Sequence, residues 1–539
     1  MFPAGAAALP GDLDPTFSGD GFAFLGFDGL TGKNLSGGAG PMEVQPDGRI
    51  VVATSANVSP GPQVARAMPD GTLDRSWAGD GQLSARDLPD GHEFRAGFIA
   101  DLALDPEGRT VLAGSDTDRT RLWLARLTAG GELDGGFGGG DGVVIHDLRG
   151  GEEELTNVEV QPDGRIVAVG GAGESQLIAR FAQDGQLDPS FSGDGLRIEP
   201  WAPFERRYGF VDLALRPDGR IVAYGPTQMR LPDYETEVRQ YTPGGEPDPS
   251  FSGDGSVVVG FGGKYSEPRA LVLDEEGRAL LLAENFSSDY EIHRLSAGGE
   301  PDATFGTAGA VKLTPPPTFP GEFSDLYSLN TLILDDRARM LVVGNRPKES
   351  GVVGRVTAEG TMDQSFSGDG WASNYTRDGG FGFGDIEVAG EVLYASGATS
   401  EPGLARFELV DGPLDADADG VLDSDDECPF LFEDCPPIGR RVTLRRKQGA
   451  PRVLKGKLHS PDTECSEFSF SGPASKISIF RVRKGSDTKV GRADPHSLSG
   501  FSFRGASPDR RYYAVVQRKL LAYGECPRER SRAVPRASG

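Results

Sequence analysis

The chain has 539 residues, 37% hydrophobic side chains, 77 glycines, 39 prolines and a formal net charge of −26. This length exceeds that of one ordinary domain, and the acidity argues against a general nucleic-acid binder. No stretch of about 18 apolar residues exists, so we expect no transmembrane segment. The many glycines and prolines indicate short strands joined by tight turns, hence an all-β chain.

Residues 1–10 are rich in alanine but have neither a basic start nor a full apolar core. Ala6 and Ala8 are placed like the small residues that precede a signal-peptidase site. We therefore expect 1–10 to be the remnant of a secretion signal that begins upstream. A chance resemblance is the alternative.

Residues 11–412 contain seven copies of one unit, spaced 54–61 residues apart. Between anchors, a Pro-Asp-Gly-Arg turn that leads into an apolar strand recurs, as does an apolar-Ala-Arg strand. Repetition at such a period is typical of propellers and solenoids. The copies are anchored on the aromatic residue of segments like Leu-Asp-Pro-Thr-Phe-Ser-Gly-Asp-Gly, at Phe17, Trp77, Phe137, Phe191, Phe251, Phe305 and Phe366.

Each unit contains about four candidate strands. In the fourth unit they are Leu196–Ile198, Val211–Arg216, Arg220–Tyr224 and Glu237–Tyr241. Strands such as Ile166–Val169 are almost continuously apolar, as expected when both faces of a sheet pack against neighbours. Radial stacking of the sheets would bury those faces and close a ring. The prediction is a seven-bladed β-propeller, with an open solenoid as the alternative.

The repeated segments resemble the delta-60 repeat family, whose hallmark is Leu-Asp-x-x-Phe-x-x-Asp-Gly followed by Gln-Pro-Asp-Gly-(Lys/Arg)-Ile. The match includes Gln45–Arg49 and Gln161–Arg165, and it covers 11 to about 412. The sixth unit departs most, at Gly306–Gly309 and Asp335–Ala338. The resemblance implies a propeller-like architecture and no settled activity.

Aspartates such as Asp14, Asp20, Asp188 and Asp194 recur in every unit, which suggests either calcium sites or turn residues. We favour turns, because Asp before Gly tolerates left-handed φ and caps its own backbone. A recurrent arginine is predicted to pair with these aspartates between blades. It stands at Arg66, Arg126, Arg180, Arg294, Arg355 and Arg406.

Residues 413–436 contain the motif with the most definite chemistry. A twelve-residue loop carries carboxylates at positions 1, 3, 5, 9 and 12, glycine at 6 and a free carbonyl at 7, a spacing that can wrap oxygen ligands around Ca²⁺. With Cys428–Pro429 following, it resembles a single thrombospondin type 3 repeat. An acidic linker is the alternative. The expected ligands are Asp415, Asp417, Asp419, Val421 (through its carbonyl), Asp423 and Asp426.

All four cysteines, Cys428, Cys435, Cys465 and Cys526, follow the repeats. An even number clustered in one region favours disulfides in an oxidising compartment. Of the three possible pairings we prefer Cys428–Cys435 with Cys465–Cys526. A zinc site is the alternative, although paired Cys-x-x-Cys spacings are missing.

Residues 437–539 carry 23 basic and 8 acidic side chains, a balance of +15, whereas the preceding part carries −41. Such a change marks a module boundary. The predicted module is a small basic β-sandwich of the immunoglobulin or transthyretin-like type, able to bind an anionic cell-envelope polymer. Its expected strands are Val442–Leu444, Val453–Leu458, Lys476–Val482, Ser499–Phe503 and Tyr512–Gln517.

The five histidines are scattered, and no catalytic or phosphate-binding motif stands out. The expectation is a secreted or cell-surface, non-enzymatic, calcium-binding scaffold with a protein or polysaccharide ligand. The alternative is an extracellular propeller hydrolase or lyase with a central-channel site, because catalytic residues from different blades would leave no sequence motif. The places to search for one are 201–208, 315–327 and 379–384.

Overall fold

The described residues of the computed structural model fall into two compact units, one within 11–409 and the other within 441–516. Each unit is described by itself. In the described part of the chain, no helix is long and apolar enough to cross a membrane. The first unit is described over residues 11–27, 39–54, 63–84, 97–148, 151–200, 209–227, 235–260, 266–285, 289–313, 328–346, 350–373, 382–398 and 402–409, except positions 12, 15, 174 and 368.

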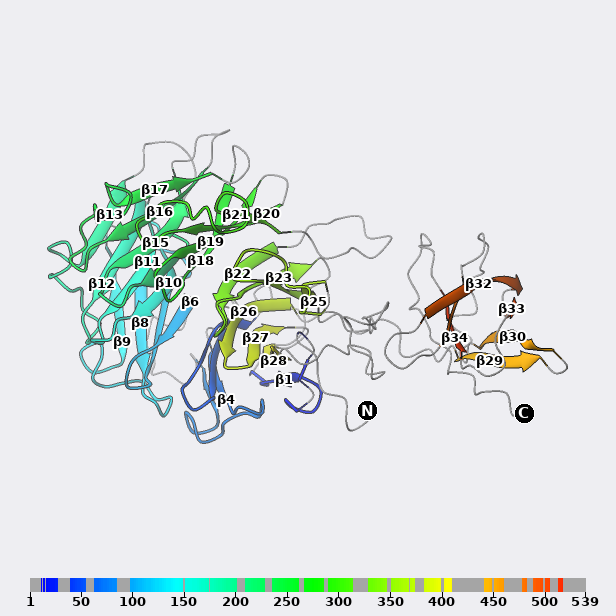
Figure 1. Cartoon of the computed structure of the whole chain (residues 1–539). Helices are drawn as coiled ribbons and strands as arrows, with labels where there is room; N and C mark the ends of the chain where they lie inside the picture. Colours follow the sequence, from blue (N-terminus) through cyan, green and yellow to red (C-terminus); the bar gives the residue numbers. More distant parts are fainter. Residues whose placement is uncertain are drawn as a thin grey trace. The chain divides into compact units, whose positions relative to one another are not determined.

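The first unit contains seven four-stranded antiparallel sheets, and we call these blades 1 to 7 (Figure 1). In blades 1 to 6, strands that are consecutive in sequence pair in order. The first strands of neighbouring blades contact each other in a complete circuit, from β2 through β6, β10, β14, β18, β22 and β26 back to β2. These first strands are therefore innermost, and the predicted seven-bladed β-propeller is confirmed.

The strand bounds of blades 1 to 3 are β2 (Ala39–Val44), β3 (Ile50–Thr54), β4 (Gln63–Ala67) and β5 (Gln82–Ser84); β6 (Gly97–Leu104), β7 (Thr110–Asp116), β8 (Leu122–Leu127) and β9 (Val143–His146); β10 (Glu153–Val160), β11 (Ile166–Ala172), β12 (Ser175–Phe181) and β13 (Leu196–Pro200). Those of blades 4 to 6 are β14 (Asp212–Leu215), β15 (Ile221–Pro226), β16 (Thr236–Tyr241) and β17 (Ser256–Val259); β18 (Ser266–Leu273), β19 (Ala279–Asn285), β20 (Tyr290–Leu295) and β21 (Ala310–Lys312); β22 (Ser328–Leu334), β23 (Met340–Arg346), β24 (Ser350–Val356) and β25 (Trp371–Ser373).

Blade 7 is assembled from both ends of the repeat region. It combines β26 (Gly382–Ala389), β27 (Val392–Ala398) and β28 (Pro402–Glu408) with β1 (Phe22–Phe24), in the order β1-β28-β27-β26. Strand β1 pairs antiparallel with β28, with Ala23 opposite Leu404. This non-covalent closure excludes the open solenoid, because the first repeat segment completes the last blade.

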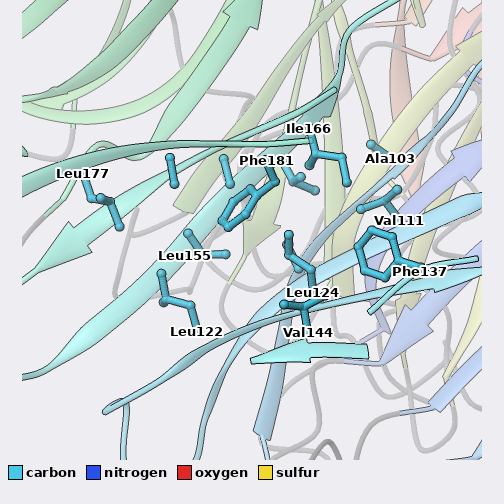
Figure 2. Close-up of a cluster of buried hydrophobic side chains, with 14 of the residues drawn as sticks. Ala103, Val111, Leu122, Leu124, Phe137, Val144, Leu155, Ile166, Leu177 and Phe181 are labelled. Carbon is cyan, nitrogen blue, oxygen red and sulfur yellow. The ribbon is translucent and has the colours of Figure 1, made fainter. Parts of the chain in front are cut away.

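The core lies between blades, as the apolar character of both strand faces predicted. Strand β7 is buried along its whole length, and β3 and β15 are too. Figure 2 shows the cluster between blades 2 and 3, where Leu124 and Phe137 lie near Leu155 and Ile166. Burying one such side chain contributes roughly 1.5–3 kcal/mol relative to leaving it exposed. Radial stacking therefore supplies the apolar burial that a single sheet could not.

The anchor aromatics of the repeats point into this core and restrict the turn of the next blade. Phe191 is fully buried, and Gly245 of blade 4 lies directly over its ring. A Cβ at Gly245 would come within 2.8 Å of that ring, and its φ of +90° is one that glycine adopts readily. Glycine is therefore required at position 245 for two reasons: the Phe191 ring lies too close for a Cβ, and the backbone adopts a positive φ.

The second unit is described only over the backbone of its six strands: β29 (Arg441–Lys447), β30 (Ala450–His459), β31 (Ile477–Arg481), β32 (Thr488–Ser497), β33 (Gly500–Arg504) and β34 (Tyr512–Val516). Their order is β29-β30-β33-β32-β31-β34, all antiparallel. The five strands expected from the sequence are present, and β32 is an additional one. The arrangement as a two-layer sandwich remains a prediction.

Candidate functional site

The two ends of the propeller differ in how regular their connections are. Connections from the first to the second strand and from the third to the fourth lie at one end, which we call the repeat face. In blades 1 to 6 they span five and 14–15 residues respectively. The other end, which we call the variable face, carries the second-to-third and blade-to-blade connections. These range from two residues (173–174) to nine (227–235) and from six (147–152) to 15 (313–327).

The repeat face is held by one polar unit that recurs around the ring. In blade 3, Nε of Arg180 donates to Oδ2 of Asp188 at 2.9 Å, Nη2 donates to the Ser190 hydroxyl at 2.9 Å, and the guanidinium lies 5.0 Å from the Phe191 ring. Both charged side chains are buried. Hydrogen bonds to ionised groups and cation–π contacts are strong in such surroundings, so the unit fixes the turn.

The prediction that arginine and aspartate pair between blades is wrong. Arg126 pairs with Asp134, and Arg355 pairs with Asp363, eight residues later in the same blade. The bridge between blades is instead a hydrogen bond from Nη1 of the arginine to a backbone carbonyl of the next blade, as from Arg294 to Ala358 at 2.8 Å. An eight-residue spacing fits the short bridge between the third strand and the following turn, such as Leu295 with Pro301.

Blade 4 has a swapped version of the same unit, which sequence reasoning missed. Gln240 occupies the arginine position, and its Nε2 donates to Asp248 at 2.7 Å. The guanidinium comes instead from Arg216, whose Nε donates to Oε1 of Gln240 at 2.6 Å and whose Nη1 donates to the Gly277 carbonyl of blade 5 at 2.7 Å. The signal was available: where the first and third repeats read Gln-Pro-Asp-Gly, this one reads Arg-Pro-Asp-Gly.

The recurrent turn aspartates have the structural role that the sequence favoured. Oδ1 of Asp194 accepts from the Leu196 backbone N–H at 3.0 Å, and Oδ1 of Asp20 accepts from Phe22 at 3.0 Å. The left-handed φ falls on other residues of the turn, including Ser192 at 51° and Gly193 at 91°. The aspartates therefore cap their own backbone, but they do not themselves adopt left-handed φ.

A second polar feature lies on the innermost strands, which face the central channel. Six carboxyl side chains occupy two equivalent positions of these strands: Asp101, Asp212 and Asp385 at one, and Glu43, Glu159 and Glu387 two residues further along their own strands. A register shift between Phe383 and Asp385, and similar shifts in five other inner strands, kink the strand next to this level.

All three aspartates of this set link neighbouring blades. Oδ2 of Asp101 accepts from the Val158 backbone N–H at 2.9 Å, and Oδ2 of Asp212 accepts from Leu271 at 2.7 Å. Oδ2 of Asp385 accepts from Met42 at 3.0 Å. Parallel inner strands of adjacent blades do not form a ladder here, so these carboxylates supply acceptors for backbone N–H groups.

The channel carboxyls are hard to ionise. Burial raises the pKa of Asp385 to about 6 and that of Glu159 to about 7. Burial also raises the pKa of Asp212 to about 7, although hydrogen bonds from Leu271 and Leu213 oppose the rise. The pKa of Glu387 rises to about 8, first through burial and then through the charge of Asp385. Such perturbation is a property of functional sites, and of structural networks as well.

The described chain places no histidine beside these acids. His146 lies on β9, where it contacts the Gly185 carbonyl at 3.1 Å, and His293 lies on β20 beside Glu291. Burial lowers the pKa of both imidazoles. Within the described residues, no group of three or more potential ligands is arranged to hold a metal ion. In the structure, the channel carboxyls are therefore acceptors for backbone N–H groups and groups of the same charge sign, without a histidine partner among the described residues.

Several predicted sites lie outside the described residues. These include the calcium loop from Asp415 to Asp426 and the four cysteines Cys428, Cys435, Cys465 and Cys526. Of the search regions, 201–208 and 315–327 lie outside too. The third, 379–384, is partly strand: Phe383 belongs to β26, is buried, and packs edge-on against Phe407 with ring centroids 5.7 Å apart. Its aromatic side chain therefore serves the core.

Comparison with known proteins supports the architecture. A family model described as a domain of unknown function (DUF5122) β-propeller matches residues 45–76 and 161–191. No curated protein matches the chain. Similar solved structures include the polysaccharide lyase Uly1, at 12% identity and a TM-score of 0.42, with 70% of this chain and 91% of that chain covered. A protein of unknown function from Bacteroides caccae is 12% identical, with a TM-score of 0.33 and coverages of 58% and 94%.

Proposed function

We propose that the protein is a non-enzymatic recognition scaffold whose variable face binds a protein or polysaccharide ligand outside the cell. The observation that carries this proposal is the difference between the two faces. The repeat face uses the same buried Arg–Asp unit in blade after blade, as in Arg180–Asp188 and Arg355–Asp363. The variable face joins the same strands through connections of unequal length. Binding residues concentrate on loops that a rigid scaffold positions.

The channel chemistry supports a scaffold more than a hydrolase or lyase. A glycosidase needs one carboxyl as proton donor and a second as base or nucleophile, both free to meet substrate. Here Asp101, Asp212, Asp385 and Glu387 accept backbone hydrogen bonds from the adjacent blade. Four of the six carboxyls are thereby engaged in holding blades together. The remaining two, Glu43 and Glu159, are the residues to test for catalysis.

The part of the proposal beyond the propeller rests on sequence. The loop from Asp415 to Asp426 would bind Ca²⁺ and stiffen the link to the basic module 437–539, with disulfides among the four cysteines. The balance of +15 on that module suits an anionic cell-envelope polymer. A location outside the cell would supply both the calcium that the loop needs and the oxidising conditions that the disulfides need.

Calcium binding is tested by calorimetric titration of the full chain beside Asp417→Ala/Asp419→Ala. The expected result is saturable binding, with a dissociation constant of roughly 0.1–1 mM, that is lost in the double variant. Equal heats from both proteins, or none from either at 10-fold higher calcium, would reduce the loop to an acidic linker. The matched control is Asp423→Asn alone, which keeps a neutral oxygen and should weaken binding without abolishing it.

Ligand recognition is tested by co-sedimentation of the full chain with insoluble polysaccharides and cell-envelope fractions. Replacing 201–211 with the shorter connection 147–152 should abolish binding, whereas Gln186→Ala on the repeat face should leave it unchanged. Release of new chain ends from the bound polymer, lost in Glu43→Gln or Glu159→Gln, would instead establish the hydrolase or lyase.

A further inference from the structure

The short connection between β7 and β8 of blade 2 is held rigidly on the variable face. Oδ1 of Asp116 accepts from the N–H groups of Thr120 and Arg121, at 2.7 and 3.2 Å. Its Oδ2 accepts from the Thr120 hydroxyl at 3.0 Å and from Nε of Arg121 at 3.1 Å. The Arg119 carbonyl accepts from the Glu153 N–H of blade 3 at 2.6 Å. The connection is therefore fixed to two blades at once.

Arg119 in this connection adopts a left-handed backbone conformation, with a φ of 51°. Among the described non-glycine residues, it is the one with such a φ on the variable face. The others lie in the recurrent turns of the repeat face, at Ser18, Ala78, Ser192, Ser252, Ala308, Ala338 and Ser367. A left-handed φ is unfavourable for a residue with a Cβ, whereas glycine adopts it readily. Turn geometry alone would therefore favour glycine at position 119, and the arginine side chain calls for a reason of its own.

The Arg119 guanidinium reaches the innermost strands at the boundary between blades 2 and 3. Its central carbon lies 5.6 Å from the centre of the partly exposed Phe98 ring on β6, and Nη1 donates to Oε2 of Glu154 on β10 at 2.8 Å. The Arg119 side chain is 47% exposed and that of Glu154 is 45% exposed. An ion pair this exposed contributes little to stability, so it does not account for arginine at a strained position.

One edge of the Arg119 guanidinium stays open. Nε and Nη2 lie along the same edge of its plane, away from Nη1, and neither donates a hydrogen bond to a described residue. Two parallel N–H groups match the two oxygens of a carboxylate, the bidentate geometry that makes arginine–carboxylate contacts strong. The Phe98 ring beside them offers an apolar surface, as aromatic side chains do in ligand sites that place a few polar groups around them.

We propose that Arg119 and Phe98 form a subsite for the uronic-acid residues of an anionic polysaccharide. The Nε–Nη2 edge binds the sugar carboxylate, and the Phe98 ring contacts the C–H face of the sugar. Glu154 is a positioning residue, because it holds Nη1 and leaves the open edge on the side away from its own charge. The inference rests on the proposed function, since it names the class of ligand that the variable face would take.

Hydrogen exchange of the full chain, measured by mass spectrometry with and without oligogalacturonate, tests this subsite. The expected result is protection of 97–104 and 116–122. A neutral maltodextrin of the same length lacks the carboxylate, and poly-glutamate lacks the sugar ring, so neither should protect these residues. Binding of the acid to the basic module would appear separately, as protection within 437–539.

The variant Arg119→Gly separates recognition from folding. Glycine relieves the left-handed φ and so offsets the loss of an exposed ion pair, and the urea midpoint should change little. The dissociation constant for oligogalacturonate, read from the protection of 116–122, should rise about 10- to 100-fold. Arg119→Lys keeps the charge without the two parallel donors and should raise it about 10-fold. The matched control is Arg165→Ala on the repeat face, where a 42% exposed arginine pairs with Asp163, and it should leave binding unchanged.

The outcomes separate this inference from the proposed function. Unchanged protection of 116–122 in Arg119→Gly, or equal protection by maltodextrin or poly-glutamate, would overturn the uronate subsite and leave the variable face as a ligand-binding surface. No protection within 11–409 by any of the probes would overturn the subsite as well. Together with a lack of co-sedimentation, that last result would overturn the proposed function too.

Discussion

Removing the carboxylate of Asp14 should release the N-terminal strand from blade 7. Oδ2 of Asp14 accepts from Nε of Arg406 at 2.7 Å, and Oδ1 accepts from the Thr16 N–H at 2.8 Å. Burial alone would raise the pKa of Asp14, but the hydrogen bonds from Thr16 and Arg406 outweigh it and lower that pKa. The pair joins the two ends of the repeat region, 392 residues apart in sequence.

The size of the effect follows from burial. The Asp14 side chain is 4% exposed and that of Arg406 is 15% exposed. Breaking a buried ion pair by removing one partner costs about 3–5 kcal/mol. Arg406 keeps its hydrogen bond to the Pro69 carbonyl and some access to water, so we take the lower end, about 3 kcal/mol. That free energy corresponds to a change of about 100-fold in an opening equilibrium.

The assay is native-state hydrogen exchange of β1 in Asp14→Ala, with Asp363→Ala as the matched control. Asp363 makes the same pair with Arg355 in blade 6, whose strands are covalently continuous. Both variants should lose stability, but only Asp14→Ala should raise exchange of Phe22–Phe24, by about 100-fold. The reasoning is refuted if Asp363→Ala exposes β1 to the same extent, or if β1 exchanges in Asp14→Ala as in the natural protein.

Two further predictions concern the polar units of the propeller. Raised pKa values, as in Glu387 and Asp212, mean that the folded state binds protons more tightly, so stability should fall as pH rises from about 4 to 8. Asp248 acts in the opposite window: burial opposes its ionisation, but hydrogen bonds lower its pKa to about 2, so its contribution is lost as pH falls below about 4. The urea midpoint should therefore be higher at pH 4.5 than at pH 8, and the reverse order would contradict this assignment. In blade 4, Arg216→Gln and Gln240→Arg should each destabilise the protein by about 2 kcal/mol. The double variant should recover at least about 1 kcal/mol of the summed loss, because it restores the arrangement of blade 3. Strictly additive free energies of urea unfolding would show that the two side chains are independent.

Much of the fold could be predicted because the repeat is a local signal. Segments such as Gln161–Arg165 determine a turn by themselves, and the anchor Phe191 identifies its blade wherever it occurs. The channel carboxyls were missed for the opposite reason: Asp101, Asp212 and Asp385 are separated by complete blades and share no motif with known chemistry. A weak signal was present, since Asp-Leu-Ala-Leu occurs at both 101 and 212, and a charged residue beside an apolar run in an inner strand needs a partner.

The sequence by itself determined the number of blades, their four-strand pattern and the turn role of the recurrent aspartates, because these depend on short apolar runs and turn chemistry within about 60 residues. Tertiary structure alone decided which residues meet across blades. It joined Asp14 to Arg406, gave blade 4 its guanidinium from Arg216, and set Glu387 of blade 7 against the Val44 N–H of blade 1. Ring closure superposes positions that are far apart along the chain, so contacts at the channel depend on the geometry of seven blades together and on no single segment.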